Sequence, residues 1–298
     1  MSEYSWPLSD TDKRIATLKG EYYSLTEKQK LSELRKQYDE GYSHEMFEDN
    51  PKIFIYTPTY NRSDILKNCA LKSVLAQTYS NFEYLIVGDG CTDDTEEVVR
   101  NCGDSRVHFF SVPARSWRYP PSAENHWLAG PVEAANTALK MANGRWIARL
   151  DDDDEWVSDH LEYSLRFAMK NECEFVSGLA REWRDGVESV SSSQSLYGDY
   201  FRLENPAGGG GYNPSIGGTS SWLYRSYLRY FEYNMDCWRK SYNRVNDIDL
   251  VVRFGLMGVR IGCTERVEFL NKPRPGDTTV GSDAYKRAPQ KMENFYKF

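Results

Sequence analysis

Apolar residues in the first half of this chain gather in short segments of strand length, separated by stretches with helical spacing. The strand-length segments are residues 53–56, 84–87, 107–112 and 146–150. Between them, apolar positions recur three and four residues apart, as they do along one face of a helix. Strands that alternate with helices in this way predict an α/β fold with a doubly wound, mostly parallel sheet.

The first fifty residues lack this alternation and predict a helical extension. Residues 26–29 fit a capping box, Leu31, Leu34 and Tyr38 share one helical face, and Gly41 can end the helix. The apolar stripe is narrow, so we expect this helix to pack on the main domain rather than fold alone.

The second half of the chain is less regular. Residues 174–177 predict a strand and residues 247–257 predict a helix. Residues 207–218 and 272–283 contain Gly and Pro and few apolar anchors, so we expect both to be mobile and to order over bound ligands. The predicted organisation is an extension at residues 1–50 and one domain at residues 51–298, divided into halves at 51–157 and 158–298.

Composition limits the class of protein. A chain of 298 residues with 40% hydrophobic and 27% charged residues can bury a proper core and is typical of a soluble protein. It has no apolar run long enough for a membrane span or a signal peptide. The six cysteines show no Cys-x-x-Cys pairing, which favours reduced thiols and a cytoplasmic location. A net charge of −7 argues against a nucleic-acid partner without excluding one, and the oligomeric state is left open.

Polar and acidic residues follow three of the predicted strands directly, at residues 57–62, 88–95 and 150–156. The carboxyl ends of strands form the edge at which open α/β sheets bind ligands. The third segment places four carboxylates in a row, at residues 151–154, and these repel one another unless they are solvated or bound to a cation. The pattern indicates a divalent metal that holds phosphates, and so a nucleotide-dependent transferase.

The order and the residues of these segments resemble those of glycosyltransferase family 2, whose catalytic domains have the GT-A fold. The resemblance is specific from about residue 52 to 159 and includes the helical phrase at residues 73–79. It is weaker at residues 246–250, which are similar to the family's Glu-Asp catalytic segment. The resemblance implies an inverting enzyme with a Rossmann-like GT-A domain, which transfers a sugar from a nucleoside-diphosphate sugar to a hydroxyl acceptor.

For the metal, the resemblance places Asp153 on the second Asp of the family's DxD motif, and so predicts a ligand of Mn²⁺ or Mg²⁺. Asp151 and Asp152 would then contact the ribose or metal-bound water. Capping of the helix that follows Ser158 is a purely structural alternative, and it explains one carboxylate but not four.

For the nucleotide, the resemblance implies that Asp89 accepts the uracil N3–H, that Tyr60 stacks on the ring, and that Pro58 and Thr59 shape the pocket. The predicted donor is therefore a UDP-sugar. The structural alternative is that Asp89 and Gly90 form an ordinary turn.

The chain departs from the family pattern at two positions. Gly88 stands where Asp is usual, and Ala135 precedes Asn136 where Arg is common. Asn136 is still predicted to bind the nucleotide-sugar. Without the expected Arg, the diphosphate needs another cation, and the sequence offers Arg62, Arg149, Lys272 and Arg274, of which Arg62 also belongs to the predicted nucleotide-sugar site.

For the catalytic base, the resemblance selects Asp247, with Asn246 in place of the family's Glu. An Asp near the acceptor hydroxyl, in a partly desolvated cleft, can take its proton. Asp249 is the nearest alternative base. A purely structural alternative is that both acids only stabilise a helix N-terminus.

The acceptor stays open between a surface polysaccharide or lipid-linked glycan, a protein and a modified nucleobase. Members of the family that polymerise processively usually have membrane helices and a Gln-x-x-Arg-Trp motif. The sequence shows neither, so the resemblance favours the addition of single sugars. A second enzyme hypothesis is a nucleotidyltransferase, which shares this sheet topology. Such an enzyme should carry a Gly-rich, basic phosphate loop after the first strand, whereas residues 58–60 are Pro-Thr-Tyr. A catalytically silent sugar-nucleotide or glycan-binding module conflicts with the joint presence of Asp89, Asp153 and Asp247.

Overall fold

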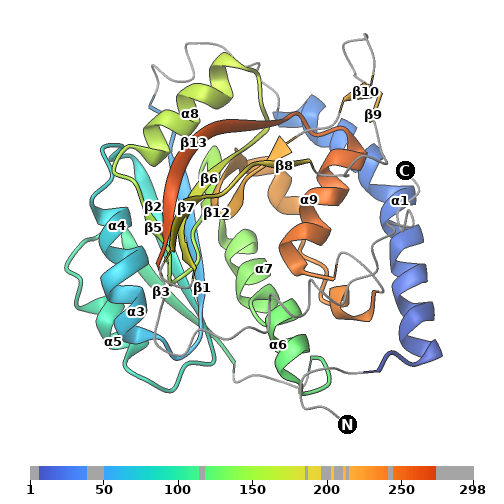
Figure 1. Ribbon diagram of the computed structural model, residues 1–298, viewed down its shortest axis with the longest axis horizontal. Helices are drawn as coiled ribbons and strands as arrows, with labels where there is room; N and C mark the ends of the chain where they lie inside the picture. Colours follow the sequence, from blue (N-terminus) through green and yellow to red (C-terminus); the bar gives the residue numbers. More distant parts are fainter. Residues whose placement is uncertain are drawn as a thin grey trace.

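The computed structural model describes residues 7–38, 50–113, 118–184, 187–195, 203–204, 211–212, 215–240 and 244–272. Within these residues, a nine-stranded sheet runs through the molecule in the order β3-β2-β1-β4-β12-β6-β13-β5, with β7 paired to β6. Helices cover both faces of the sheet (Figure 1).

The first half of the sheet is parallel. Its strands are β1 (Ile53–Thr59), β2 (Phe82–Asp89), β3 (Val107–Val112) and β4 (Trp146–Arg149). All seven residues of β1 are buried, because the strand pairs with β2 and β4 on either side and is covered on both faces. This double burial explains why the strand is a continuous apolar run rather than an alternating one.

The second half of the sheet is mixed. It contains β5 (Glu155–Trp156), β6 (Phe175–Arg184), β7 (Val187–Val190), β12 (Gly218–Arg225) and β13 (Ile261–Asn271). Strand β12 is antiparallel to both β4 and β6, whereas β13 is parallel to β6. Two small pairs lie apart from the main sheet: β8 (Gln194–Ser195) with β11 (Ser215–Ile216), and β9 (Leu203–Glu204) with β10 (Gly211–Tyr212).

One face of the sheet is covered by a helix that passes without a break through α3 (Ser63–Leu66), η1 (Lys67–Leu71) and α4 (Lys72–Leu75), and by α5 (Thr95–Arg100) and α8 (His160–Lys170). Leu66, Val74 and Leu161 pack there against Ile53 and Ile55 of β1.

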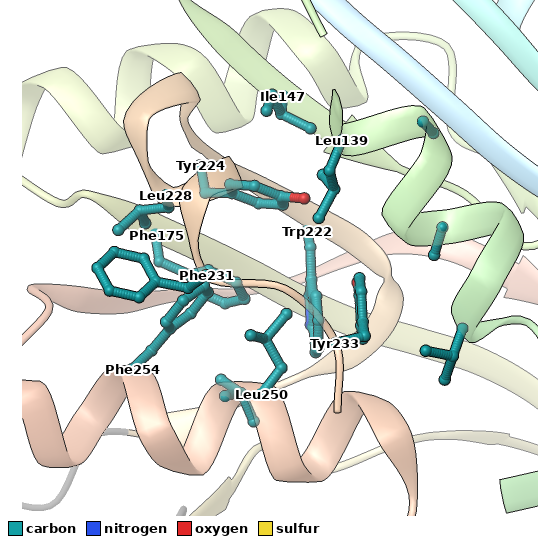
Figure 2. Close-up of a cluster of buried hydrophobic side chains, with 14 of the residues drawn as sticks. Leu139, Ile147, Phe175, Trp222, Tyr224, Leu228, Phe231, Tyr233, Leu250 and Phe254 are labelled. Atoms are coloured by element: carbon teal, nitrogen blue, oxygen red, sulfur yellow. The ribbon is translucent and has the colours of Figure 1, made fainter. Parts of the chain in front are cut away.

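The opposite face is covered by α6 (Ala123–Ala129), α7 (Val132–Met141), α9 (Asn246–Met257), η3 (Ser226–Tyr230) and η4 (Cys237–Arg239). Its core is rich in aromatic rings that lie between β12 and α9 (Figure 2). The Phe175 ring packs edge-on against Trp222 at 5.0 Å and against Phe254 at 5.9 Å between centroids. Gly258 ends α9 in a left-handed conformation, with φ at 85°, which favours Gly because it has no Cβ.

The predicted fold class is confirmed, since the structure is an α/β protein with a mostly parallel central sheet and an N-terminal helix. That helix, α1 (Asp10–Tyr38), begins well before the position that the sequence predicts. Ser9 and Asp12 bond to each other's backbone N–H and cap its start. Thr26 lies in the helix interior and donates to the Tyr22 carbonyl, so the predicted capping box is wrong. Within a long helix, the hydroxyl of such a Thr bonds to the carbonyl four residues earlier instead of capping a helix start.

Of the two segments predicted to be mobile, residues 207–210, 213–214 and 273–283 lie outside the described residues. Residues 215–216 and 218 belong to strands rather than to a loop. A Cβ at Gly217 would come within 1.8 Å of the Gly178 carbonyl oxygen, and one at Gly218 within 2.4 Å of the Phe269 ring. These glycines therefore permit close strand packing. The Gly-rich composition of the segment is typical of a loop, which is why the sequence predicts one here.

Candidate active site

The three polar segments meet at one edge of the sheet. Thr59 at the end of β1 is in register with Gly88 of β2, and Tyr56 is in register with Arg149 of β4. The Thr59 hydroxyl donates to Asp152 Oδ2 at 2.8 Å, which joins the first segment to the acidic one. Parallel strands bring their carboxyl ends to the same edge, so motifs about ninety residues apart become neighbours.

The turn after β1 joins the first segment to the second. Asn61 has a φ of 50°, a left-handed conformation that Asn adopts more readily than most residues. Its side-chain oxygen accepts from Thr92 N at 2.8 Å. Gly88 has a steric reason, because a Cβ there would lie 2.7 Å from the Phe109 ring. The space that a side chain would need at position 88 is filled from β3.

Four consecutive aspartates, residues 151–154, come shortly after β4, and the second and fourth are buried. Asp154 accepts from Ser220 Oγ at 2.5 Å and from Asn271 Nδ2 at 2.9 Å, which ties the segment to β12 and β13. Asp152 is 5% exposed and accepts from Thr59 and from Arg62. Burial raises the pKa of Asp152, and the charge of Arg62 opposes that rise without cancelling it.

The other two acids are more accessible and are bound by arginines. The side chain of Asp151 is 35% exposed and that of Asp153 is 15% exposed. Arg62 Nη1 lies 3.0 Å from Asp152 Oδ1 and 2.8 Å from Asp153 Oδ2, so one guanidinium bridges two neighbouring carboxylates. The guanidinium cation of Arg62 therefore reduces the repulsion between the carboxylates of the acidic segment.

This segment also meets the needs of one type of metal site. Among the described residues, no group of three or more His, Cys, Asp or Glu side chains is arranged to hold a metal ion. A Mg²⁺ or Mn²⁺ ion that arrives with a diphosphate needs only one or two carboxylates, since phosphate oxygens and water complete its shell. The partly exposed carboxylates of Asp151 and Asp153 fit that requirement.

The segment at residues 73–79 contacts the chain that follows the acidic segment, through the side chain of Gln77. Gln77 Nε2 donates to the Val157 carbonyl at 2.8 Å, and Gln77 Oε1 accepts from Leu161 N at 3.1 Å. One side chain therefore links α4 to the chain that follows the four acids, which gives this Gln a structural role.

Asp89 ends β2 and is 2% exposed. Arg118, which precedes α6, donates from Nη1 to Asp89 Oδ1 at 3.0 Å. No spacing in the sequence points to Arg118, because it reaches Asp89 from a long connection. Ala135, where the family's Arg is common, is fully buried in the core of α7.

Aromatic side chains lie beside this edge. Tyr60 is 38% exposed, and its ring lies edge-on to His126 with centroids 6.4 Å apart. His126 Nδ1 in turn shares a hydrogen bond with Tyr119 OH at 3.0 Å. An exposed ring directly after β1 offers a surface on which a flat base can stack.

Asn136 is buried, and both ends of its amide bond the backbone of Tyr233. Its Nδ2 donates to the Tyr233 carbonyl at 3.0 Å, and its Oδ1 accepts from Tyr233 N at 2.8 Å. The Tyr233 hydroxyl accepts from Arg149 Nη1 at 2.8 Å, and Arg149 also donates to Asp151. A continuous chain of hydrogen bonds therefore runs from Asn136 through Tyr233 and Arg149 to Asp151.

The arginines and lysine considered for the diphosphate differ in accessibility. Burial disfavours the charged form of Arg149, but neighbouring Tyr233 and Asp151 raise its pKa well above the ordinary value. Its side chain is only 3% exposed, whereas that of Arg62 is 48% exposed. Lys272 pairs with Glu155 at 2.7 Å, and position 274 lies outside the described residues. The side chains of Arg62 and Lys272 are almost equally exposed, at 48% and 47%, and Arg62 is the one that contacts both Asp152 and Asp153.

Asp247 lies in the first turn of α9 and reaches the same edge across β12. Its Oδ2 accepts from Thr219 Oγ1 at 2.5 Å. The next residue, Ser220, donates to Asp154 and accepts from Asp151 N at 3.1 Å. The predicted base is thus two hydrogen bonds and one peptide unit away from the acidic segment.

Asp249, the alternative base, has a different environment. It is 0% exposed and accepts from Lys240 Nζ at 2.6 Å and from Arg253 Nε at 3.2 Å. A carboxylate enclosed by two cations within the core has no path to a substrate hydroxyl. The geometry therefore favours Asp247.

Comparisons with known proteins show the family to which the chain belongs. Residues 54–231 match the model of the family described as "Glycosyl transferase family 2", so the chain belongs to that family. A curated relative is UDP-Glc:alpha-D-GlcNAc-diphosphoundecaprenol beta-1,3-glucosyltransferase WfgD of Escherichia coli. It is 35% identical over 130 residues, which are 44% of this chain and 46% of WfgD. The chain thus matches about half the length of that relative.

Two solved structures share the fold. Staphylococcus aureus TarS 1–349 in complex with UDP-GlcNAc has a TM-score of 0.56 and 18% identity, over 78% of this chain and 61% of that one. Mannosyltransferase PcManGT from Pyrobaculum calidifontis, in complex with GDP-Man and Mn²⁺, has a TM-score of 0.51 and 17% identity, over 76% and 58%. The predicted family and its GT-A fold are confirmed. None of the helices in the described ranges combines the length and apolar character needed to cross a membrane, and the cytoplasmic location stays a prediction.

Proposed function

We propose that this chain is a metal-dependent, inverting glycosyltransferase that moves a sugar from a UDP-sugar to a hydroxyl acceptor in glycan or surface polysaccharide biosynthesis. The observation that carries the proposal is the meeting of Asp89, the acidic segment and Asp247 at one sheet edge. The relatives add support, since WfgD is named for a UDP-sugar donor and a lipid-linked glycan, and TarS was solved with UDP-GlcNAc.

The base would bind between Tyr60 and Asp89. Uracil presents one N–H donor between two carbonyl acceptors along its edge. The Asp89 carboxylate would accept the N3–H, and Arg118, 3.0 Å from Asp89, would donate to a carbonyl beside it. Buried Pro58 and Thr59 would shape the floor of the pocket at the end of β1.

The diphosphate would bind beside the acidic segment. A bound Mn²⁺ or Mg²⁺ ion would neutralise charge on the diphosphate as it leaves. Asp153 would hold this ion, with Asp151 and Asp152 directed at the ribose or at water on the ion. Arg62 bridges Asp152 and Asp153, and we assign to it the diphosphate contact when a metal ion is bound to these carboxylates. Asn136 would act indirectly, by holding Tyr233 against Arg149 and thereby orienting Asp151.

Asp247 would act as the general base. It would take the proton of the acceptor hydroxyl while the oxygen of that hydroxyl attacks the anomeric carbon and the bond to the diphosphate breaks. A single displacement of this kind inverts the anomeric configuration. Thr219 Oγ1 donates to Asp247 Oδ2 and leaves the carboxylate able to accept a further proton.

A donor screen tests the proposal. We expect UDP with manganese to raise the melting temperature more than GDP, dTDP or CMP, because a ligand that binds only the native state stabilises it by mass action. With manganese, the chain should also hydrolyse a UDP-sugar faster than sugars activated by the other three nucleotides. Binding of UDP without any turnover would indicate a silent binding module, and a preference for GDP would overturn the assignment of Asp89.

A further inference from the structure

The outward face of α1 carries large apolar side chains that the core does not use. Leu18 is 56% exposed, Tyr22 is 60% exposed and Leu25 is 80% exposed. Helix α1 lies at the periphery of the molecule, with α9 between it and the sheet (Figure 1). The other exposed large apolar residues of the described ranges are spread over separate elements: Tyr60, Phe110, Met141, Tyr163, Val187, Val190 and Tyr230. Scattered residues of that kind are normal, whereas three along one helical face are not.

A separate face of α1 contacts the domain. Ala16, Leu31 and Leu34 of that face are buried. Ion pairs fasten it as well, since Glu27 pairs with Arg253, and Arg35 Nη2 lies 2.5 Å from Glu174 Oε2. The helix is thus held firmly on its inner side, and the outer side chains are presented on a rigid element that loses little freedom on binding a partner.

The outer stripe has the spacing of a coiled-coil seam. Half-buried Ile15 precedes Leu18, Tyr22 and Leu25, so the intervals are three, four and three residues. Residues 15 and 22 take the a positions of a heptad, and residues 18 and 25 take the d positions. A β-branched residue at a with Leu at d favours two parallel strands, a preference that the first of the two heptads meets.

Charges beside the seam favour the parallel arrangement over the antiparallel one. In a parallel pair, Lys28 at g lies opposite Glu33 at e of the second copy, and the two-fold axis repeats this attraction. The same pairing places Arg14 at g opposite Lys19 at e of the second copy, and this repulsion is reduced because Asp236 already pairs with Lys19 at 2.6 Å. An antiparallel pair that aligns the four apolar residues would place Glu21 opposite itself and Arg14 opposite Lys28. Both of those contacts are repulsive.

We propose that α1 is a self-association surface, which pairs its outer stripe (Ile15, Leu18, Tyr22 and Leu25) with the same stripe of a second copy in a short parallel coil. Two heptads bury less surface than a typical stable interface of about 1,200 Å² or more. The dimer should therefore be reversible, with a dissociation constant in the micromolar range or weaker. This inference does not depend on the proposed activity.

Sedimentation of the full chain over a concentration series tests the proposal. The mass of the parent protein should rise toward twice the monomer, and Leu25→Glu should remain monomeric at every concentration. Thr17→Glu is the matched control, because Thr17 is exposed on the same helix but lies off the stripe. It should associate like the parent. A parent protein that stays monomeric at its highest soluble concentration would overturn the proposal.

Cross-linking tests the orientation. A parallel coil brings position 25 of each copy together, so Leu25→Cys should form a covalent dimer under mild oxidation, above the background of the six native cysteines. The absence of this product in a dimer of confirmed mass would overturn the parallel arrangement. Lys28→Glu and Glu33→Lys should each weaken association, and the double variant should restore it.

Two further measurements separate the other occupants of the stripe. If Leu25→Glu lowers the melting temperature of a monomeric parent, another part of the same chain covers the stripe and the proposal is wrong. If the parent binds anionic lipid vesicles as a monomer and Leu25→Glu does not, the partner is a membrane surface, and the proposal is again wrong.

Discussion

At the ends of β1, β2 and β4, the candidate functional side chains lie at or just after the end of their strands, whereas Asp247 lies on a helix that is held by an ion pair with the N-terminal extension. Asp89 is placed by the register of β2 with β3, and Asp152 follows β4 closely and is held by Thr59 at the end of β1. Helix α9 is clamped differently, because Arg253 pairs with both Asp249 of the same helix and Glu27 of α1. Glu27 and Arg253 are 226 residues apart in the chain.

The contrast shows that the two parts of the candidate site rest on different physics. Strand pairing places the proposed nucleotide-binding part through backbone hydrogen bonds, which depend little on the identity of the side chain. The proposed acceptor part, with Asp247 on α9, depends on buried charges that stabilise one arrangement only while every partner is present. Substitutions should therefore separate donor binding from the positioning of the base.

The largest effect should follow from Asp247→Asn, which keeps the size of the side chain but removes its ability to take a proton. Turnover of UDP-sugar should fall by roughly 10²–10⁴-fold, while UDP affinity stays nearly unchanged. Steady-state rates and calorimetry measure the two quantities, and proton NMR of the product should show an inverted anomeric configuration. Near-normal turnover would move the base elsewhere, and a retained configuration would exclude a single displacement.

Asp153→Ala should remove the gain in UDP affinity and activity that manganese provides. Electrostatic stabilisation by a metal is worth several kcal/mol, so we expect a loss of roughly 10²-fold or more in turnover. Calorimetry of UDP with and without manganese gives a readout that is independent of activity. Asp154→Asn is the contrasting variant, because Asp154 is bound to Ser220 and Asn271 and should affect stability instead. Equal manganese dependence in the Asp153→Ala variant and the parent would refute the assignment.

Arg253→Met should destabilise the proposed acceptor part by about 3–5 kcal/mol, because it leaves buried Glu27 without its paired cation and leaves Asp249 paired with Lys240 alone. The free energy of unfolding in urea measures this loss. Arg100→Met is the matched control, since Arg100 is 69% exposed and pairs with Glu96 at the surface. Its effect should stay below about 1 kcal/mol. Similar losses in the two variants would show that α9 does not depend on the clamp.

Asp89→Ala should weaken UDP binding by about 1.5–3 kcal/mol, the usual contribution of a hydrogen bond to a charged group. The rate on fully bound donor should change less than the affinity. Arg118→Ala should also weaken UDP binding, because Arg118 lies beside Asp89. Calorimetry that finds the Asp89→Ala variant as tight as the parent would place the base pocket elsewhere.

The smallest effect concerns pH and distinguishes two ion pairs of α1. Burial raises the pKa of Glu27 to about 7, and Arg253 offsets only part of that rise. The folded state then binds more protons than the unfolded state between pH 4.5 and 7, so the free energy of unfolding should fall as pH rises through this window. At about 1.4 kcal/mol per pKa unit, and because one of the two states is half-titrated at each end of the window, the loss should be about 2–3 kcal/mol. Glu27→Gln should remove this slope.

Glu174 should behave in the opposite way. Burial opposes its charged form, but hydrogen bonds and charge from Arg35 outweigh that cost and hold its pKa below the usual range. Its contribution is present above the ordinary pKa of a Glu and is lost as pH falls through the lowered value. Urea unfolding of Glu27→Gln and Glu174→Gln across pH should therefore give differences from the parent of opposite sign. Equal pH profiles would contradict both pKa assignments.

Much of the fold and of the donor edge could be predicted, because the signals are local. Apolar runs of strand length and helical spacing between them determine the first half of the sheet, and residues directly after strands must lie at its edge. Asp89, Asp152 and Asp153 are brought close to Arg118 and Arg62 there. The start of α1 was mispredicted because the capping pattern at Thr26 also fits a helix interior, where Thr26 bonds to the Tyr22 carbonyl.

By itself, the sequence determined the fold class, the family and the segments that form the site, since periodicity and neighbouring residues carry that information. The tertiary structure alone decided which side chains take which partners. Arg118 reaches Asp89, Asn136 is turned to the Tyr233 backbone, and Asp249 is enclosed by Lys240 and Arg253. These outcomes depend on burial and on charges from distant parts of the chain. A carboxylate two residues from another can therefore be a catalytic candidate or a structural ion pair, and only its surroundings distinguish the two.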